Sequence, residues 1–580
     1  MSPVRLIGAA LLSLYLLPAW GINESIAPES ATGWQQPDPV IAESSLVVTA
    51  HPLATQAGFD ILQQGGSALD AAVAIQAMLT LVEPQSSGIG GGAFLLYWDQ
   101  SRQTLHAYDG RETAPANADP ELFLRDDGTP MPWQKALVGG RSVGVPGVLR
   151  MLELAHHRHG QLAWSDLFKP GIEQAKQGFV IGNRLHQLIA DRVNPGLGRY
   201  PASRAYFFDD AGQPLAAGTR LRNPELARSL QLIADQGADA LYQGPLADAI
   251  IASVQSVSDN PGRLRREDLA RYQARERKPI CLPYQRYRIC SFPPPTSGGV
   301  TLLQMLGLLE HTPLPTLPPD SADFIHLFTQ ASRLAYADRG RYLADPDFVQ
   351  VPTAALLDQS YLRQRAQLIN PEQDMGEALP GQPLTLSRAD DRSPELPSTS
   401  HFVIRDAEGN LVSMTTSIEM AFGSTLMAGG FLLNNQLTDF SFVPDVDGVP
   451  VANRVEPGKR PRSSMTPVIV FDADNHPVAA LGSPGGSRII NYVAHSLLLM
   501  LHTDLPLQSI LSQPNISNRN STTELEAAVA PAELSVELEK RGHQVRVREM
   551  NSGIHALRLR PDGRWEAGVD PRREGMALGD

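Results

Sequence analysis

Thr399 stands where a proline-rich segment meets a strand-like segment, and its hydroxyl is a candidate nucleophile. Residues 371–398 contain five prolines, many charges and little apolar periodicity, which predicts an exposed, mobile linker that can be cut. An unmodified threonine hydroxyl is a poor nucleophile and needs a base. If the chain is cut before Thr399, the new α-amino group, with a reference pKa of about 7.7–8, can take the hydroxyl proton without a histidine. Taken alone, however, a threonine at a strand edge is common.

Gly485 and Gly486 are candidates for the donors that amide hydrolysis needs at its oxyanion. Without Cβ atoms, their backbone N–H groups can approach a substrate closely, although in isolation the pair favours a plain turn. A second glycine run, 88–92, precedes a strand and lacks the Lys-Ser/Thr of a phosphate-binding loop. That run therefore predicts close backbone packing.

Two other groups of residues were candidates for metal or redox chemistry. The His-His-Arg-His run at 156–159 has Glu153 one turn before it but no second such pair, which favours a solvated helix end over a metal site. The only cysteines, Cys281 and Cys290, flank two short predicted strands and a turn. They are consistent with a disulfide across a hairpin in an oxidising compartment, or with two buried thiols. No metal and no cofactor is implied.

The elements that must position these residues follow from periodicity and caps. A strand is predicted at 46–50, then two helices, the second flanked by Ser67 and Asp70 and running to Pro84. An apolar strand follows at 93–98, and 401–406 with 411–417 forms a hairpin by pattern. Helical patterns dominate the middle third, such as 223–236, with Asn223 as N-cap, and 322–343.

Composition and the first residues restrict the class of protein and its location. The chain has 580 residues and a formal charge of −13, from 62 acidic and 49 basic residues, which argues against a nucleic-acid partner. Residues 1–21 combine Arg5, an apolar stretch and small residues at a cleavage site, which predicts a signal peptide and a secreted or periplasmic protein. An uncleaved N-terminal anchor remains the alternative. Residues 22–44 are polar and predict a flexible lead-in.

Several motifs in the same order along the chain closely resemble the γ-glutamyltranspeptidase family of N-terminal-nucleophile hydrolases, from about Leu46 to Asp570. The motifs are Ala50-His-Pro-Leu-Ala-Thr-Gln-Ala-Gly, Asp109-Gly-Arg111-Glu-Thr-Ala-Pro, Pro293-Pro-Pro-Thr-Ser-Gly-Gly, Ala335-Tyr-Ala-Asp-Arg, Thr399-Ser-His, Leu432-Leu-Asn-Asn-Gln-Leu-Thr-Asp439-Phe-Ser, Gly458-Lys-Arg-Pro-Arg-Ser463-Ser464-Met-Thr-Pro and Gly482-Ser-Pro-Gly485-Gly486-Ser. The resemblance implies an α/β fold, a four-layer αββα sandwich.

The resemblance also implies a processing step. Thr399 would attack the Ser398 carbonyl, an N-to-O acyl shift would give an ester, and water would release the new terminus. The products would be a large subunit of residues 22–398 and a small catalytic subunit of residues 399–580, which together form a heterodimer.

Roles for the site residues are carried over position by position. Thr399 is the nucleophile, Ser417 supports it through its own hydroxyl, and Gly485 and Gly486 form the oxyanion site. The remaining positions match those that bind the α-carboxylate and the α-ammonium of the substrate: Arg111, Ser463 and Ser464 for the carboxylate, and Glu419, Gln436 and Asp439 for the ammonium. Many relatives carry Asn where Glu419 stands, but a carboxylate also accepts from an ammonium group.

The implied activity is transfer of a γ-glutamyl group from a glutathione-like small molecule to water or to an amino-acid or peptide acceptor. Between Ser441 and Lys459 there are 17 residues, Phe442 to Gly458, without tyrosine or tryptophan. Relatives with a full lid have a longer segment there that places an aromatic ring over the substrate, so a more open site is expected. The alternatives are a glutaryl-cephalosporin-type acylase on the same scaffold and a non-catalytic exported binding protein.

Overall fold

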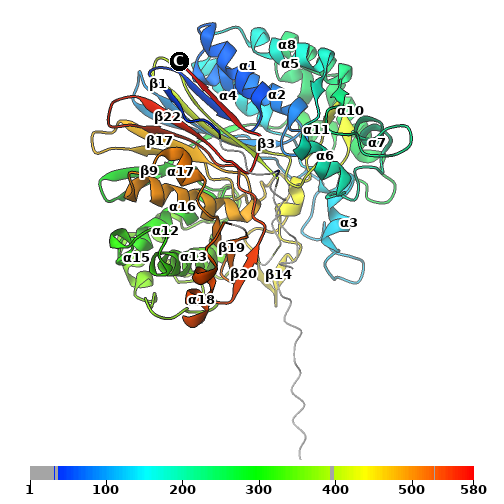
Figure 1. The fold of residues 1–580 in the computed structure, drawn as a ribbon. Coiled ribbons are helices and arrows are strands. Elements are labelled where there is room, and N and C mark those ends of the chain that lie inside the picture. Colours follow the sequence, from blue (N-terminus) through cyan, green and yellow to red (C-terminus); the bar gives the residue numbers. More distant parts are fainter. Residues whose placement is uncertain (1–31, 33–36, 392, 394–397, 528) are drawn as a thin grey trace, which may run out of the picture.

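Two seven-stranded antiparallel sheets form the centre of the molecule (Figure 1). This computed structural model describes residues 32, 37–391, 393, 398–527 and 529–580. The first sheet has the order β23 (Met576–Gly579), β2 (Leu46–Thr49), β10 (Ser400–Arg405), β11 (Leu411–Ser417), β3 (Gly92–Asp99), β4 (Thr104–Asp109) and β7 (Arg275–Arg277). The second has the order β1 (Val40–Ala42), β22 (Trp565–Val569), β21 (His555–Leu559), β17 (Pro477–Gly482), β16 (Val468–Phe471), β9 (Tyr287–Ser291) and β8 (Ile280–Tyr284).

Alternating side chains divide the interior into three apolar layers. Along β3, Phe94, Leu96 and Trp98 belong to the cluster between the two sheets, whereas Leu95 and Tyr97 belong to the cluster under the first helical layer. Successive side chains of a strand point to opposite faces, so strands covered on both faces must be apolar throughout. Each sheet therefore packs against the other sheet on one face and against helices on its other face, which confirms the four-layer αββα arrangement.

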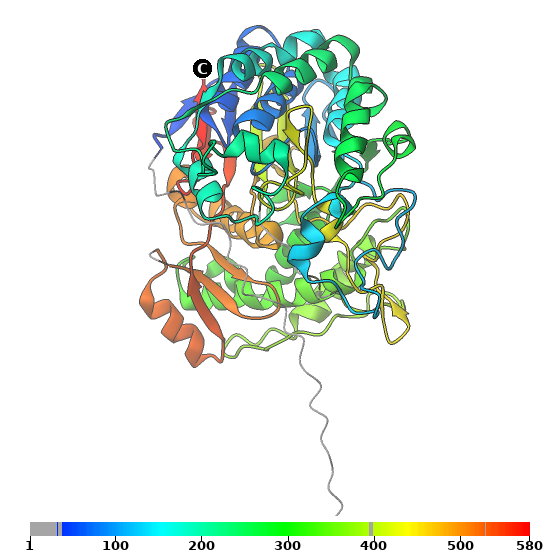
Figure 2. The same cartoon turned by 90° about the vertical axis from the view of Figure 1, so that its right-hand side faces the viewer.

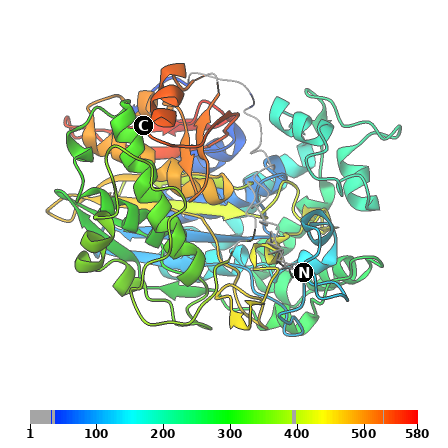
Figure 3. The ribbon, with the colours of Figure 1, turned by 90° about the horizontal axis from the view of Figure 1, so that it is seen from below.

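The helices lie on the outer face of each sheet (Figures 1 and 3). The first sheet is covered by α1 (Pro52–Gln63), α2 (Ala68–Val82), α4 (Val148–His159), α5 (Lys169–Gln177) and α8 (Pro224–Gln236). The second is covered by α12 (Gly298–Leu309), α13 (Ala322–Tyr342), α16 (Ile489–His502) and α17 (Leu507–Leu511). A small sheet of β18 (Ile516–Asn518), β19 (Thr523–Glu526) and β20 (Val545–Arg548) lies with α18 (Ala532–Lys540) beside this lower layer (Figure 2).

The predicted helix starts are confirmed by their caps. Asn223 accepts a hydrogen bond from the Leu226 amide at 2.9 Å, and Pro224 occupies the first turn of α8. Ser67 and Asp70 form a reciprocal capping box at the start of α2. Both caps satisfy amide groups that have no partner within the helix.

The predicted hairpin at the centre of the first sheet is also confirmed. Ser400 pairs with Thr416 and Arg405 with Leu411, so the register carries Thr399 to a place opposite Ser417. Gly91 and Gly92 allow the neighbouring strand to approach: a Cβ on Gly91 would lie 2.1 Å from the Ser417 carbonyl oxygen. The glycine run at 88–92 serves close packing, as its sequence predicts.

Each sheet contains strands from before and from after the Ser398–Thr399 bond. In the first sheet, β10 and β11 are flanked on both sides by strands from before the bond, namely β2 and β3. In the second sheet, β9 pairs with β16 along Ser291 to Arg288. A cut at this bond would therefore leave two chains that share both sheets and the core between them.

Two expectations are refined by the structure. Cys281 and Cys290 lie opposite each other in the β8–β9 hairpin and form a disulfide. The lead-in expected at 22–44 contains a strand, β1, because residues 40–42 pair with β22 and extend the second sheet. None of the helices in the described part of the chain is long and apolar enough to cross a membrane.

Candidate active site

Thr399 and Ser417 meet where β10 begins and β11 ends. The Thr399 Oγ1 and Ser417 Oγ atoms are 3.4 Å apart, and both side chains are buried. The Ser417 hydroxyl donates to the Ser398 carbonyl oxygen at 2.8 Å and accepts from the Glu419 amide at 2.7 Å. The Thr399 hydroxyl thus lies next to a peptide carbonyl that accepts a hydrogen bond from the Ser417 hydroxyl.

Both sides of the Ser398–Thr399 bond are held by other parts of the chain. The Ser398 hydroxyl donates to the Gln85 carbonyl at 2.8 Å, and Arg573 donates to the Thr399 carbonyl at 3.2 Å. Ser398 is only 1% exposed, so the expectation of an exposed linker is wrong at its last residue. Ser398 is buried because its hydroxyl is bonded to the Gln85 carbonyl in the interior of the protein. Residues 392 and 394–397 of the predicted linker lie outside the described residues.

A small pocket of about 30 Å³ opens beside the threonine. It is lined by Arg111, Ser398, Thr399, Ser417, Glu419, Gln436, Asp439, Arg462, Ser463, Ser464, Met465, Gly486 and Ile489. These residues come from segments more than 370 positions apart in the chain. The structure therefore brings together nearly all the residues that the sequence singled out, while Gly485 lies one residue beyond the lining.

Arg111 is buried at one side of this pocket. Its guanidinium donates to the carbonyl oxygens of Pro461 at 3.1 Å and Arg462 at 3.0 Å, and it forms an ion pair with Asp439. Glu112 lies beside it, 3.5 Å from Nη1, and burial raises the pKa of this carboxyl to about 8. The carbonyl contacts fix the plane of the guanidinium. A carboxylate ligand can then accept hydrogen bonds from it in a defined geometry.

Oxygen acceptors gather around Glu419. Its backbone φ is +79°, a left-handed conformation that is uncommon for a residue with a side chain, and Asn435 donates to its carboxyl group. Burial, and next the charge of Asp439, hold the pKa of Glu419 well above its usual range. Gln436 Oε1 is buried and receives no hydrogen bond from the residues that the structure describes. The group therefore has more acceptor oxygens than donors from the described residues, which suits a cation with several N–H groups.

Ser463 and Ser464 line the pocket on the side of the second sheet. The Met465 amide donates to Ser463 Oγ at 3.2 Å, and Arg339 Nη2 donates to Ser464 Oγ at 2.7 Å. Hydroxyl groups that accept from a fixed donor have a defined orientation for their own hydrogen. They can therefore donate to an anionic group in the pocket.

The Gly485–Gly486 turn joins β17 to α16. Gly485 has a φ of +136° and Gly486 a φ of +60°, and a Cβ on Gly485 would lie 2.7 Å from Tyr492. Such a turn requires glycine, and its backbone amides precede the start of a helix. Arg488, two residues on, forms a two-point ion pair with Glu524, at 2.6 and 2.7 Å, which anchors the turn.

The histidine run lies outside the pocket lining and is only in part the solvated helix end that the sequence predicts: His157 and Arg158 are exposed, whereas His156 and His159 are half-buried. The imidazole of His159 packs against Tyr97 at a centroid distance of 4.4 Å and bonds to the Tyr108 hydroxyl at 2.7 Å. His156 Nε2 lies 3.0 Å from the Leu162 carbonyl oxygen. The helix end is therefore packed on the first sheet, because the chain folds back over it after Gly160.

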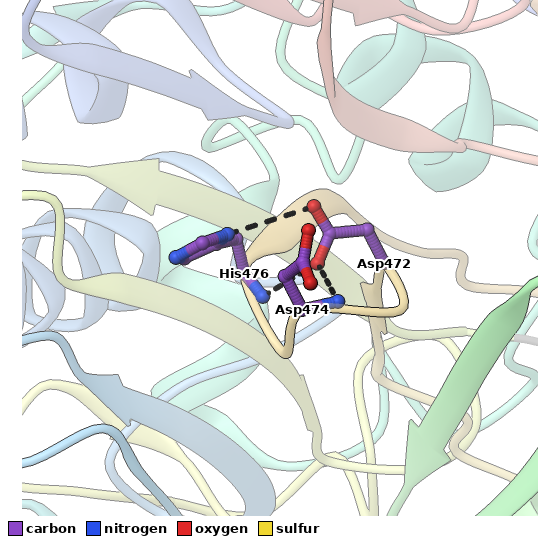
Figure 4. A group of neighbouring side chains, drawn as sticks. All are labelled: Asp472, Asp474 and His476. Atoms are coloured by element: carbon purple, nitrogen blue, oxygen red, sulfur yellow. Dashed lines mark hydrogen bonds and ion pairs between the residues drawn. The ribbon is translucent and has the colours of Figure 1, made fainter.

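Within the described ranges, one group of carboxylates and an imidazole lies close enough to share an ion: Asp472, Asp474 and His476 (Figure 4). All three belong to the turn between β16 and β17. Asp472 accepts from the amides of Asp474 at 3.0 Å and His476 at 2.8 Å. These contacts account for the cluster as a turn, and we assign no site to it.

Three lining residues were missed by the sequence analysis: Arg462, Met465 and Ile489. Arg462 and Met465 flank the serine pair within a recognised motif, so their position was a usable signal. Ile489 opens α16, and its apolar side chain carried no signal of a site. Its place in the pocket depends on how the Gly485–Gly486 turn directs the helix.

A threonine at the start of a central strand, between two antiparallel sheets covered by helices, defines the class of N-terminal-nucleophile hydrolases. Within that class, the chain belongs to the γ-glutamyltranspeptidase family, whose model matches residues 54–580.

The chain is 37% identical over 565 residues to the glutathione hydrolase proenzyme of Bacillus subtilis (strain 168), covering 95% of this chain and 94% of that protein. It is 34% identical to the acylase ACY 1 proenzyme of Pseudomonas sp. (strain SE83), covering 93% and 94%. Among solved structures, the cephalosporin acylase of Bacillus halodurans matches with a TM-score of 0.82 and 27% identity, covering 96% and 99%.

Proposed function

We propose that this protein is a γ-glutamyl hydrolase and transferase that activates itself by cutting the Ser398–Thr399 bond. Thr399 Oγ1 attacks the Ser398 carbonyl carbon, the C–N bond breaks, and the proton passes to the departing Thr399 nitrogen. The resulting ester is hydrolysed by water, which leaves a carboxylate on Ser398 and a free amine on Thr399. The contact that supports this step is the 2.8 Å hydrogen bond from Ser417 to the Ser398 carbonyl, which stabilises the negative charge that develops there.

The cut produces the base for turnover. The α-amino group of Thr399 takes the proton of its own hydroxyl, which attacks the γ-carbonyl of the substrate. The amine half of the substrate leaves, and water or an acceptor amine then takes the acyl group from Thr399. The amide groups of Gly485 and Gly486 are the proposed donors to the oxyanion of both tetrahedral intermediates.

The unsatisfied acceptor in the pocket supports a substrate with an α-ammonium group. Gln436 Oε1 is buried without a donor from the described residues, and the carboxyl groups of Glu419 and Asp439 lie in the same pocket. A γ-glutamyl group offers three N–H donors there and a carboxylate to Arg111, Ser463 and Ser464. Leaving the buried Gln436 oxygen unpaired costs about 1–3 kcal/mol, which favours this substrate over one without the ammonium.

A second candidate is an acylase for glutaryl amides, which lack the α-ammonium group. It is favoured by the similarity to the cephalosporin acylase and by the short 442–458 segment. Residues 445–450 of that segment form an exposed hairpin, β14 (Asp445–Val446) with β15 (Val449–Pro450), and Phe442 stacks on Phe123 at 4.4 Å. The ratio of turnover of γ-glutamyl and glutaryl anilides separates the two functions.

The experiment that tests the proposal combines N-terminal sequencing of the small fragment with a γ-glutamyl anilide assay. We expect the fragment to begin Thr-Ser-His-Phe, and Thr399→Ala to show neither cleavage nor turnover. A wild-type protein that stays uncut and binds without turnover would support the non-catalytic binding protein instead. Sequencing the large fragment also tests export, since removal of residues 1–21 is expected; those residues lie outside the described ones.

A further inference from the structure

Two of the recognised motifs that contribute no residue to the pocket lining converge on Ser463 and Ser464. One is the segment 293–299, which leads into α12, and the other is the end of α13 around Arg339. The proposed function so far gives neither of them a role. Their contacts to the serine pair suggest one.

Residues 296–298 hold the backbone of the serine pair. The Ser297 amide and hydroxyl both donate to the Ser463 carbonyl, at 2.8 and 2.6 Å, and Thr296 Oγ1 donates to the Met465 carbonyl at 2.7 Å. The approach is so close that a Cβ on Gly298 would lie 2.5 Å from the Met465 carbonyl oxygen. Three donors thus fix the carbonyl groups on either side of Ser464.

Arg339 completes the arrangement from α13. Its side chain is buried, Nε donates to Ser297 Oγ at 2.8 Å, and Nη2 donates to Ser464 Oγ at 2.7 Å. An arginine can only donate, so both hydroxyl groups must accept from it. The Ser297 hydrogen then points to the Ser463 carbonyl, and the Ser464 hydrogen must point away from Arg339.

We infer that Arg339 and Ser297 are positioning residues for the α-carboxylate half of the substrate pocket. Arg339 fixes the direction of the Ser464 hydroxyl, and Ser297 transmits the same support to the Ser463 backbone. The inference rests on the proposed function, because it assumes that Ser463 and Ser464 donate to a substrate carboxylate. It gives the motif at 335–339 a role in recognition although it lies behind the pocket wall.

A selectivity assay tests this inference with two anilides that differ at one group. γ-Glutamyl-p-nitroanilide carries the α-carboxylate, and 4-aminobutyryl-p-nitroanilide has the amine without it. We expect Arg339→Gln to lower kcat/KM for the γ-glutamyl substrate by about tenfold to a hundredfold, mainly through KM, and to change the 4-aminobutyryl value less than twofold. Rates are divided by the fraction of chain that is cleaved, so that slower processing does not count as slower turnover.

A matched control is Arg341→Gln, on the same helix, whose side chain pairs with Asp390 near the surface. It should leave both substrates within twofold of wild type. Arg339→Lys keeps the charge but cannot reach both hydroxyl groups as a fork, so its loss should be smaller than that of Arg339→Gln. Equal losses on both substrates, or no loss at all, would overturn the inference.

Two further variants keep the test decisive. If Arg339→Gln does not fold, Ser297→Ala is judged by the same selectivity criterion. In a Ser464→Ala background, adding Arg339→Gln should lower kcat/KM for the γ-glutamyl substrate by less than a further threefold. The reason is that the hydroxyl group that Arg339 orients is already absent. If Arg339→Gln lowers kcat/KM in that background by the same factor as in the wild type, the inference is contradicted. Absence of γ-glutamyl turnover in the wild type would overturn the proposed function itself.

Discussion

Replacing Ser417 by alanine tests the processing step most directly. The substitution removes the hydroxyl that donates to the Ser398 carbonyl at 2.8 Å, the oxygen on which charge develops during attack by Thr399. Loss of one donor to a developing oxyanion typically slows a reaction by ~10²–10³-fold. We therefore expect cleavage of Ser417→Ala to slow by about that factor, and Ser417→Thr, which keeps the hydroxyl, to stay within about tenfold of wild type.

The same substitution has a cost in stability that must be separated from its effect on rate. The Glu419 amide loses its acceptor at 2.7 Å, and an unmade buried hydrogen bond costs about 1–3 kcal/mol. Ser413→Ala is a matched control: it lies on the same face of β11, is buried, and loses a 3.2 Å bond to the Leu481 carbonyl without contact to Ser398. It should lower stability by a similar amount or less and leave the cleavage rate unchanged.

The assay follows purified precursor on a denaturing gel over time, with the free energy of unfolding measured in parallel by urea titration. If Ser417→Ala cleaves at the wild-type rate, the role assigned to this hydroxyl is refuted. If Ser413→Ala slows cleavage as much as Ser417→Ala, the effect comes from strand stability and not from the carbonyl contact.

Three further predictions concern recognition and stability. Glu419→Gln should lower kcat/KM for a γ-glutamyl anilide about tenfold and leave a glutaryl anilide unchanged or faster, because it removes a partner of the ammonium only; equal losses would contradict this. Glu524→Gln should lower the free energy of unfolding by about 3–5 kcal/mol at pH 7, since it leaves the buried Arg488 without its two-point partner. Burial alone raises the pKa of Glu524, but the surrounding arginines lower it to about 2, below the unfolded value of 4.5. Its stabilisation is thus present above pH 4.5 and lost as pH falls towards 2, so urea titrations should show the difference between wild type and variant shrinking over that range; a constant difference would exclude this origin. Replacing Cys281 and Cys290 by serine should lower the free energy of unfolding by about 2–3 kcal/mol, the loop-closure value for their separation of 9 residues, and an unchanged urea midpoint would show that the bond adds nothing.

Local pattern in the sequence determined much of the frame. Alternation and turn residues predicted the 401–417 hairpin, and the structure supplied its register, which places Thr399 opposite Ser417. Caps at Ser67 and Asn223 set the starts of two helices because capping is an interaction between residues three positions apart. These features depend on contacts within one turn or one hairpin, so the sequence alone carries them.

Tertiary structure alone decided the environment of the site. The burial of Ser398, whose hydroxyl donates to Gln85 across 313 positions, and the raised pKa of Glu419 each depend on packing against other segments of the chain. So does the link from Arg339 to Ser464, across 125 positions. Desolvation and hydrogen-bond direction arise only when such segments pack against each other, because they depend on which groups exclude water around a side chain. The sequence named the candidate site residues, and the packing of two sheets gave them their burial and their geometry.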